Sequence, residues 1–198
     1  MNIKNIIFDY GNTIVEFNPE KIVKSFGVTG TDVSLVAGAV FDRAHWDKSD
    51  RGLITQEEFI KGALCNVPER LHAKATAICN GWITALPFIN GMDSLIRKLK
   101  KDGYKLYLLS NISDYFAQNS GGIKIFKEFD GLVFSGEIKM VKPGREIFEY
   151  ILTKYSLRPE ESVFIDDNAD NIRAAEKMGI RSLEFDGDFK KAEKFIYG

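Results

Sequence analysis

Residues 3–14 read IKNIIFDYGNTI, and this stretch decides the fold. Its first half, Ile3 to Phe8, is an apolar run of the kind found in strands that are buried on both faces of a parallel sheet. Asp9 follows at once, and a turn containing Gly11 comes directly after it. In an open α/β sheet, the carboxyl end of the first strand lies at the edge where ligands bind. The stretch therefore predicts an α/β sheet with a reactive carboxylate on its first strand.

The bulk composition indicates one medium-sized domain, or one domain that carries an insertion. The chain has 198 residues, and its 27 basic and 28 acidic side chains are well mixed and give a net charge of −1. Because no strong basic patch is visible, we expect no nucleic-acid partner. The two cysteines lack the spacing of a zinc site and indicate a reducing compartment. No apolar run suits a signal peptide or a membrane span, so we expect a soluble, cytoplasmic protein without a membrane partner.

Short apolar runs that end in polar clusters recur along the chain. They predict strands at residues 3–8, 104–109, 132–134 and 162–165, with a weaker one at 181–185. Helical patterns lie between these runs, at residues 90–101, 145–155 and 169–178. Strands that alternate with helices through short connections are typical of a Rossmann-like, doubly wound α/β core with a parallel sheet.

Residues 17–85 follow a different pattern, with marked helix starts and no convincing strand. Asn18 precedes Pro19 as an N-cap residue precedes proline at the first helical position, and Thr55 and Glu58 have the spacing of a capping box. This block is too long for a simple crossover between strands. We expect a helical cap of residues 17–85, inserted into a core made of residues 1–16 and 86–198 and placed over the carboxyl edge of the sheet.

Polar residues that follow the strands form one chemical set, because the carboxyl ends of parallel strands meet at one edge of the sheet. Transfer of a phosphoryl group needs a nucleophile, a divalent cation and fixed donors. Asp9 can attack phosphorus and form an aspartyl-phosphate. Asp167 and the second oxygen of Asp9 can hold Mg²⁺. Ser110, the Asn111 amide and the Lys142 ammonium can donate to the phosphoryl group, and Lys142 would also offset the repulsion between Asp9 and Asp167.

The stretches IIFDYGNTI, LLSN, SGEIKMVKP and FIDDNADN occur in this order. On these motifs the chain resembles the haloacid dehalogenase-like hydrolase superfamily over essentially its full length. The resemblance implies that Asp9 is the nucleophile, Ser110 the phosphate-binding hydroxyl and Lys142 the lysine that acts with them. The segment WDKSDRGLITQEEF is similar to caps of the sugar-phosphatase-like members.

The same resemblance implies a metal site. Asp167 matches the side-chain metal ligand, Asp166 lies beside it as a further candidate, and Asn171 stands where many relatives have another acid. In this family the third protein ligand is the main-chain carbonyl two residues after the nucleophile, and Gly11 can serve there. The implied cofactor is Mg²⁺.

Gly11 also departs from the family pattern, because the phosphatases of the family use an aspartate at this position as general acid and then general base. The D-x-G-N-[T/V] subgroup, which this sequence resembles, includes sugar-phosphate phosphatases of the glucose-1-phosphate type. Loss of a positioned proton donor slows a reaction by roughly 10²–10⁴-fold. We expect a cap residue or a metal-bound water to take over this task, and the candidate side chains are Glu16, His45, Asp47 and Asp50.

The leading expectation is a Mg²⁺-dependent phosphatase that acts on a small phosphorylated metabolite, with a sugar phosphate as one possibility. The first alternative is a catalytically weakened member that binds a phosphorylated ligand or a protein partner, and Gly11 is its only support. The second is a metal-free haloacid dehalogenase, but those enzymes carry a tyrosine two residues after the nucleophile, whereas Tyr10 is one residue after Asp9. The sequence carries no signal for an oligomeric state.

Overall fold

The computed structural model describes residues 3–84 and 86–198. Its sheet has five strands in the order β3-β2-β1-β4-β5, and every neighbouring pair is parallel. The strands are β1 (Asn5–Phe8), β2 (Lys105–Ser110), β3 (Gly131–Phe134), β4 (Ser162–Asp166) and β5 (Arg181–Glu184). Each of the predicted strands is present to within two residues at its ends, which confirms the predicted parallel α/β fold.

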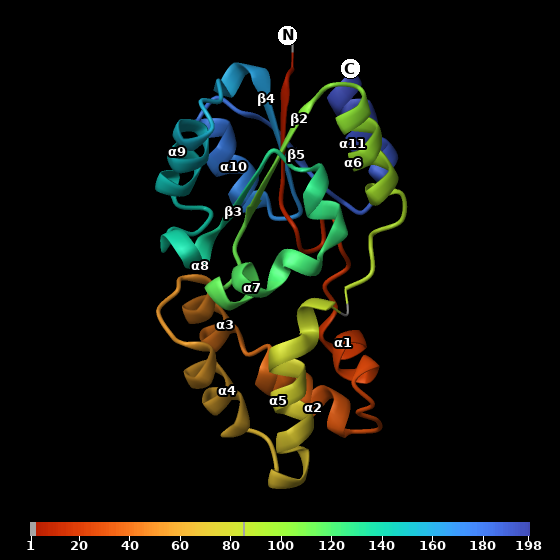
Figure 1. Cartoon of the computed structure of the whole chain (residues 1–198), viewed down its shortest axis with the longest axis vertical. Helices are drawn as coiled ribbons and strands as arrows, with labels where there is room; N and C mark the ends of the chain where they lie inside the picture. The colour runs from red at the N-terminus through yellow and green to blue at the C-terminus, as the bar shows by residue number, and fades with distance from the viewer. Residues whose placement is uncertain (1–2, 85) are drawn as a thin grey trace.

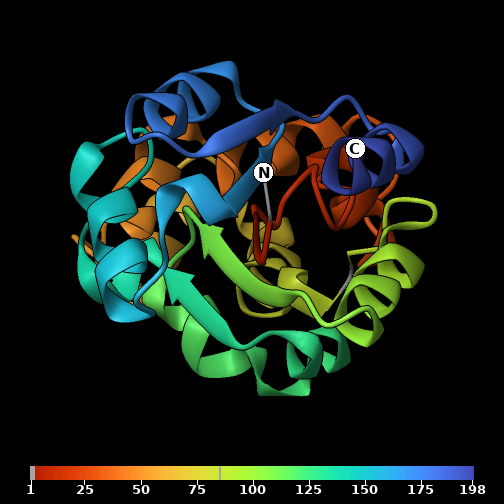
Figure 2. The same ribbon diagram turned by 90° about the horizontal axis from the view of Figure 1, so that it is seen from above.

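Six α-helices belong to the half of the described chain that carries the sheet. They are α6 (Met92–Lys101), α7 (Asp114–Asn119), α8 (Ser135–Ile138), α9 (Arg145–Lys154), α10 (Ala169–Lys177) and α11 (Phe189–Tyr197). Figure 2 shows α9 and α10 on one side of the sheet and α6 and α11 on the other. The sheet is therefore the middle layer of three.

Side chains alternate along each strand and fill a separate apolar core on each face of this sheet. Ile6 and Phe8 of β1 pack in the same cluster as the apolar side of α6, whereas Ile7 packs with α9 and α10. All three strand residues are completely buried. This explains why the strands read as continuous apolar runs, since neither face of the sheet can be polar.

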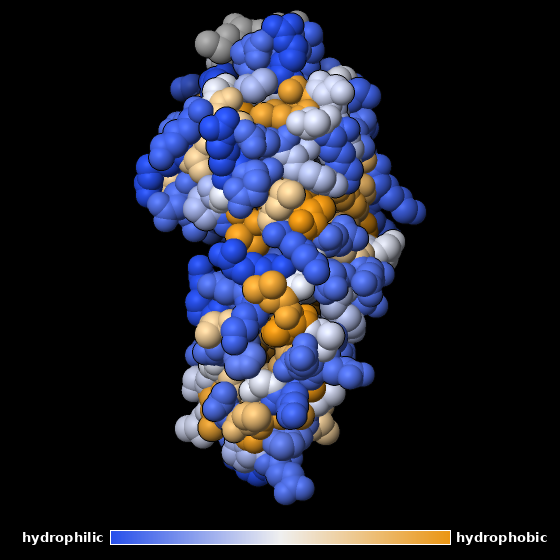
Figure 3. All heavy atoms as spheres, turned by 90° about the vertical axis from the view of Figure 1, so that its left-hand side faces the viewer, coloured by the Kyte–Doolittle hydropathy of each residue, from blue (hydrophilic) through white to orange (hydrophobic). Residues whose placement is uncertain are grey.

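The segment between β1 and β2 begins with five helices. They are α1 (Pro19–Ser25), α2 (Asp32–Val40), α3 (Arg43–Asp50), α4 (Gln56–Leu64) and α5 (His72–Gly81). Figure 1 places all five beyond the carboxyl ends of the strands, in the lower half of the view. On the face shown in Figure 3, hydrophobic atoms are visible near the waist between the two halves, and hydrophilic residues cover most of the rest.

The helix starts in this segment follow the sequence signals. The Asn18 side chain accepts a hydrogen bond from Lys21 N at 3.0 Å, and Pro19 is the first residue of α1. At the start of α4, the Thr55 hydroxyl accepts from Glu58 N at 3.2 Å, while the Glu58 carboxylate accepts from Thr55 N at 2.8 Å. Both caps satisfy amide donors that a helix cannot pair internally. Within the described residues, no helix combines the length and apolar character that a membrane span requires.

Candidate active site

Asp9, Ser110 and Asp166 stand at the carboxyl ends of three adjacent strands. Phe8, the last residue of β1, pairs with Leu108 of β2 and Ile165 of β4, so Asp9 is level with Asp166 and Ser110 lies one residue further along β2. The Asp9 amide donates to Ile165 O at 2.9 Å and extends the strand pairing by one step. The sheet thus sets the spacing between these side chains before any ligand is present.

Lys142 joins two of the strand ends through its ammonium group. Its Nζ atom lies 2.8 Å from Asp9 Oδ1 and 2.6 Å from Asp166 Oδ2, and its side chain is only 1% exposed. The expected pairing of Lys142 with Asp9 is present. The other partner is Asp166 and not Asp167, because Asp166 is the residue that points into the buried side of this edge.

Asp166 is held by several donors besides Lys142. Its Oδ1 accepts from the amide of Asn168 at 2.8 Å, and the Asn171 side chain donates to both carboxylate oxygens at 3.0 Å. Asn171 therefore orients the acid that holds Lys142. A carboxylate with this many partners is a fixed counter-charge, and it secures the position of the ammonium beside Asp9.

Burial raises the pKa of Asp9 to about 6, and the Asp166 carboxylate adds to the rise, while the Lys142 ammonium opposes it. Burial disfavours the charged form of Lys142, but the two carboxylates outweigh it and raise its pKa. At neutral pH the site therefore presents an ionised Asp9 carboxylate beside a protonated lysine.

The Asn111 side chain differs from the expected phosphate donor. Its Nδ2 donates to Lys142 O at 2.8 Å, and its Oδ1 accepts from Lys142 N at 2.8 Å. This reciprocal pair fixes the main chain of Lys142 and uses both polar atoms of the amide. The sequence placed Asn111 at the correct edge, but it could not reveal that the loop after β3 would offer a peptide group to the amide.

Ser110 is the last residue of β2. Its hydroxyl has no hydrogen-bond partner among the described residues. The residue is 3% exposed and lines the same cavity as Asp9 and Lys142. Its hydroxyl is thus available to a ligand in that cavity, in agreement with the expected position.

The residues present fit a hard divalent cation. Asp9, Asp166 and Asp167 each offer a carboxylate oxygen, and these oxygens lie within 4.8 Å of one another. Burial raises the pKa of Asp167, the Asp166 carboxylate adds to this, and the Asn12 side chain opposes it. Three converging carboxylates, two of which (Asp9 and Asp167) have a raised pKa, indicate a place where a cation would relieve their repulsion.

Gly11 adds a main-chain oxygen to this group. It lines the cavity, and no residue in the described part of the chain donates a hydrogen bond to its carbonyl. Asp166 is already engaged by Lys142 and Asn171, so Asp9, Asp167 and the Gly11 carbonyl are the oxygens with free capacity. Carboxylate and carbonyl oxygens are the ligands that Mg²⁺ prefers.

A cavity of about 240 Å³ opens above these groups, between the strand ends and α3. Phe17, Trp46, Trp82 and Leu86 form the apolar part of its wall. The ring centroids of Trp46 and Trp82 are 5.0 Å apart, and each lies within 6 Å of Phe17. The cavity therefore combines a charged floor with an aromatic wall.

The proposed proton donors occupy different places. Glu16 is half-buried but does not line the cavity, and its carboxylate lies 2.5 Å from Lys21 Nζ. The His45 ring pairs with Asp42 at 3.3 Å and packs over Gly62, outside the cavity. Asp47 and Asp50 both line the cavity, but only Asp50 is buried. The structure thus brings two of the four candidates to the site.

Sequence reasoning missed two residues around the cavity. Arg43, at the start of α3, lines it, and no local pattern distinguishes this arginine from an ordinary exposed one. Ser135 follows β3 and donates to Asp50 O at 2.6 Å, which ties α3 to the sheet. Its place directly after a predicted strand was the available signal.

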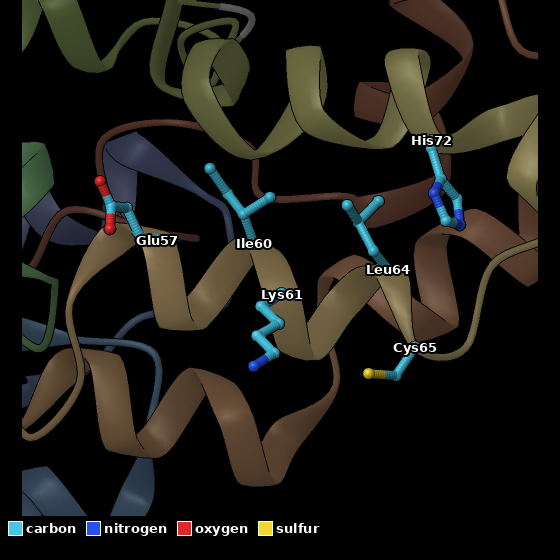
Figure 4. A pocket seen from close by; sticks show the side chains of 6 residues that line it. All are labelled: Glu57, Ile60, Lys61, Leu64, Cys65 and His72. Atoms are coloured by element: carbon cyan, nitrogen blue, oxygen red, sulfur yellow. The ribbon is translucent and has the colours of Figure 1, made fainter.

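A larger hollow of about 470 Å³ lies on α4, away from the strand ends (Figure 4). Ile60 and Leu64 project from one side of the helix and Lys61 from the other. The His72 ring, at its rim, is paired with Val67 O at 2.8 Å. The surface of this hollow is mostly apolar, unlike the charged floor of the cavity at the strand ends.

Comparison with known proteins agrees with the geometry. The chain is 28% identical to D-ribitol-5-phosphate phosphatase of Bacteroides thetaiotaomicron, over 92% of this chain and 91% of the relative. It is also 28% identical to sesquiterpene phosphatase astK of Aspergillus oryzae, over 91% of this chain and 88% of the relative.

A solved structure shares the fold. It is a haloacid dehalogenase family enzyme of Bacteroides thetaiotaomicron in complex with magnesium and inorganic phosphate, with a TM-score of 0.75 and 24% identity over 96% of this chain and 98% of the other. Residues 3–179 match the family described as haloacid dehalogenase-like hydrolase. With its relatives named as phosphatases, the expected enzyme class is confirmed, and the chain belongs to the haloacid dehalogenase-like hydrolase family.

Proposed function

We propose that this hydrolase is a Mg²⁺-dependent phosphatase that acts on a small phosphorylated metabolite through an aspartyl-phosphate on Asp9. The observation that carries the proposal is the Lys142 ammonium, 2.8 Å from Asp9 and buried beside a cluster of three acids. A buried lysine fixes and ionises a carboxylate nucleophile, and the acids next to it suit the cation that phosphoryl transfer requires.

The reaction takes two displacements. In the first, a carboxylate oxygen of Asp9 attacks phosphorus while the bond from phosphorus to the leaving oxygen breaks. In the second, water attacks phosphorus, the bond to Asp9 breaks, and inorganic phosphate leaves. Lys142 holds Asp9 in place and the Ser110 hydroxyl donates to a phosphoryl oxygen. When bound by Asp9, Asp167 and the Gly11 carbonyl, Mg²⁺ would supply positive charge that offsets the charge of the phosphoryl oxygens.

We assign Asn111 the task of holding the Lys142 main chain, since both polar atoms of its amide are used there. Asp166 orients the Lys142 ammonium and Asn171 orients Asp166. These three residues act through Lys142, and none of them touches the substrate in this proposal.

We further propose that residues 17–85 form a cap that selects the substrate, with residues 1–16 and 86–198 as the core. Residues 1, 2 and 85 of these ranges lie outside the described residues. Helix α3 supplies Trp46 and Asp47 to the cavity wall, while the strand ends supply its floor. An aromatic wall beside polar groups suits the carbon face of a polyol or sugar phosphate, and a relative is named for ribitol 5-phosphate.

The experiment that tests the proposal is phosphate release from a panel of polyol, sugar and aryl phosphates, with Mg²⁺ or with a chelator. Wild type should release phosphate only with Mg²⁺, and Asp9→Asn should lower the rate by at least about 10³-fold. Failure of wild type to hydrolyse any ester would favour a binding protein. Chloride release from 2-chloropropionate in the presence of chelator would favour a dehalogenase.

A further inference from the structure

Gly11 leaves the leaving group without the usual proton donor, although the site has room for one. A Cβ atom added at Gly11 would meet only Phe17 Cβ at 3.7 Å, which is ordinary van der Waals contact. Gly11 also has none of the positive φ angles that other glycines of the chain show. No steric or backbone constraint therefore explains the glycine, and another group must supply the proton to a poor leaving group.

Asp50 is a buried carboxyl that has no structural task. It lies at the end of α3, is 8% exposed and lines the cavity above Asp9. No side chain or amide in the described residues donates a hydrogen bond to its carboxylate oxygens. A buried acid without partners is costly to keep ionised, so its retention beside a reaction site indicates use in the reaction.

The surroundings of Asp50 keep it protonated. Burial raises the pKa of Asp50 to about 8, and the carboxylates of Asp47 and Asp9 add to the rise. Arg43 on the same helix and Lys142 from the core oppose it. At neutral pH Asp50 is mainly the neutral acid, which is the form that can give a proton to a leaving oxygen.

The main chain at Asp50 is anchored to the sheet. The Ser135 hydroxyl donates to Asp50 O at 2.6 Å, and the same hydroxyl accepts from Ile112 N at 2.8 Å. Two residues further on, Gly52 packs so closely on Gly136 that an added Cβ would lie 2.4 Å from Gly136 O. Asp50 is thus held by the half of the molecule that carries Asp9, which keeps the two carboxyls in fixed register.

We propose that Asp50 is the general acid and base of this enzyme, and this inference rests on the proposed phosphatase function. As the bond from phosphorus to the leaving oxygen breaks, the Asp50 proton moves to that oxygen, and the product leaves as an alcohol. The Asp50 carboxylate then takes a proton from the water that attacks phosphorus. Each turnover consumes one water and returns Asp50 to its protonated state.

The test compares the first displacement for two aryl esters in a single turnover, with enzyme in excess. For phenyl phosphate, a poor leaving group, Asp50→Asn should slow the release of phenol by about 10²-fold or more. For p-nitrophenyl phosphate, whose leaving group needs no proton, the slowing should stay below about 10-fold. Asp47→Asn, on the same helix and cavity wall, should change both rates by the same factor.

A rescue variant separates chemistry from damage to the fold. The double variant Gly11→Asp/Asp50→Asn places a carboxyl at position 11. It should hydrolyse phenyl phosphate about 10-fold faster, or more, than Asp50→Asn alone. If Asp50→Asn slows the hydrolysis of both esters equally and Gly11→Asp restores nothing, Asp50 is not the general acid. The phosphatase proposal would still hold in that case, provided that Asp9→Asn is inactive. Wild type without activity on either ester would overturn both.

Discussion

At Thr13, the side-chain hydroxyl is completely buried and has no hydrogen-bond partner in the described residues. A buried polar group without a partner loses its hydration and gains nothing in return. We expect Thr13→Val, which replaces the hydroxyl with a methyl group, to raise the free energy of unfolding by about 1 kcal/mol. Urea denaturation measures this change, and a loss of stability would mean that the hydroxyl is paired in solution.

Asp50 makes the stability of the protein depend on pH. Its folded-state pKa of about 8 is above the ordinary value of 3.8, so between these values the folded state binds more protons than the unfolded state. Stability contributed by this group is therefore lost as the pH rises from about 4 to about 8.

Asp50→Asn has no titrating group at this position. We therefore expect its free energy of unfolding to rise relative to that of wild type over this pH range, by a few kcal/mol at most. Urea unfolding of both proteins at pH 5 and pH 8, in the presence of a chelator, gives the comparison. A constant difference between the two proteins would contradict the raised pKa.

At the scale of the element, the capping box of Thr55 and Glu58 starts α4, whose buried side contributes Phe59 to the apolar core. Thr55→Ala removes one partner of the box and should lower the free energy of unfolding by about 1 kcal/mol. The exposed Thr153 inside α9 offers a matched control, because its hydroxyl has no partner in the described residues and alanine is the better helix former. Thermal unfolding of both variants should show a loss for Thr55→Ala alone.

The strands were predictable because each is buried on both faces, which leaves an unbroken apolar run in the sequence. The predicted strand at residues 3–8 and the observed strand β1 both end at Phe8, directly before Asp9. The edge that gathers Asp9, Ser110 and Asp166 then follows from parallel strand order. The type of each element, and the edge of the sheet at which the site lies, follow from the hydrophobic pattern, which can be read directly from the sequence.

The partners within the site were less predictable. Asp166 and Asp167 are adjacent and chemically identical, and alternation along β4 decides which of them is buried and meets Lys142. Asn111 finds its partners on a main chain 31 residues away. The orientation of Asp50 toward the cavity depends on how α3 sits over the sheet, and no local pattern encodes that placement.

At the scale of the whole molecule, the contact of Gly52, just after α3, with Gly136 of α8 makes a contribution that can be measured. Gly52 has φ +61° and Gly30 has φ +63°, so alanine is strained by a similar amount at both. Only at Gly52 would the new Cβ also meet a neighbour, Gly136 O at 2.4 Å, whereas nothing lies within 4 Å at Gly30.

We therefore expect Gly30→Ala to cost about 1–2 kcal/mol of stability and to leave turnover nearly unchanged. Gly52→Ala should cost more and should also slow turnover, because the two halves must separate at the point where Asp50 is anchored. Urea unfolding and phosphate release measure both effects. Equal behaviour of the two variants would show that this contact does not control the site.

The aromatic wall of the cavity has a further consequence. The chain contains two tryptophans, Trp46 and Trp82, and both line the cavity. The Trp82 ring also lies 5.6 Å from Phe116, which belongs to α7. All indole fluorescence of the protein therefore originates at the site itself. Emission intensity becomes an intrinsic optical probe, and a phosphate ester that fills the cavity can be titrated against it without any attached dye.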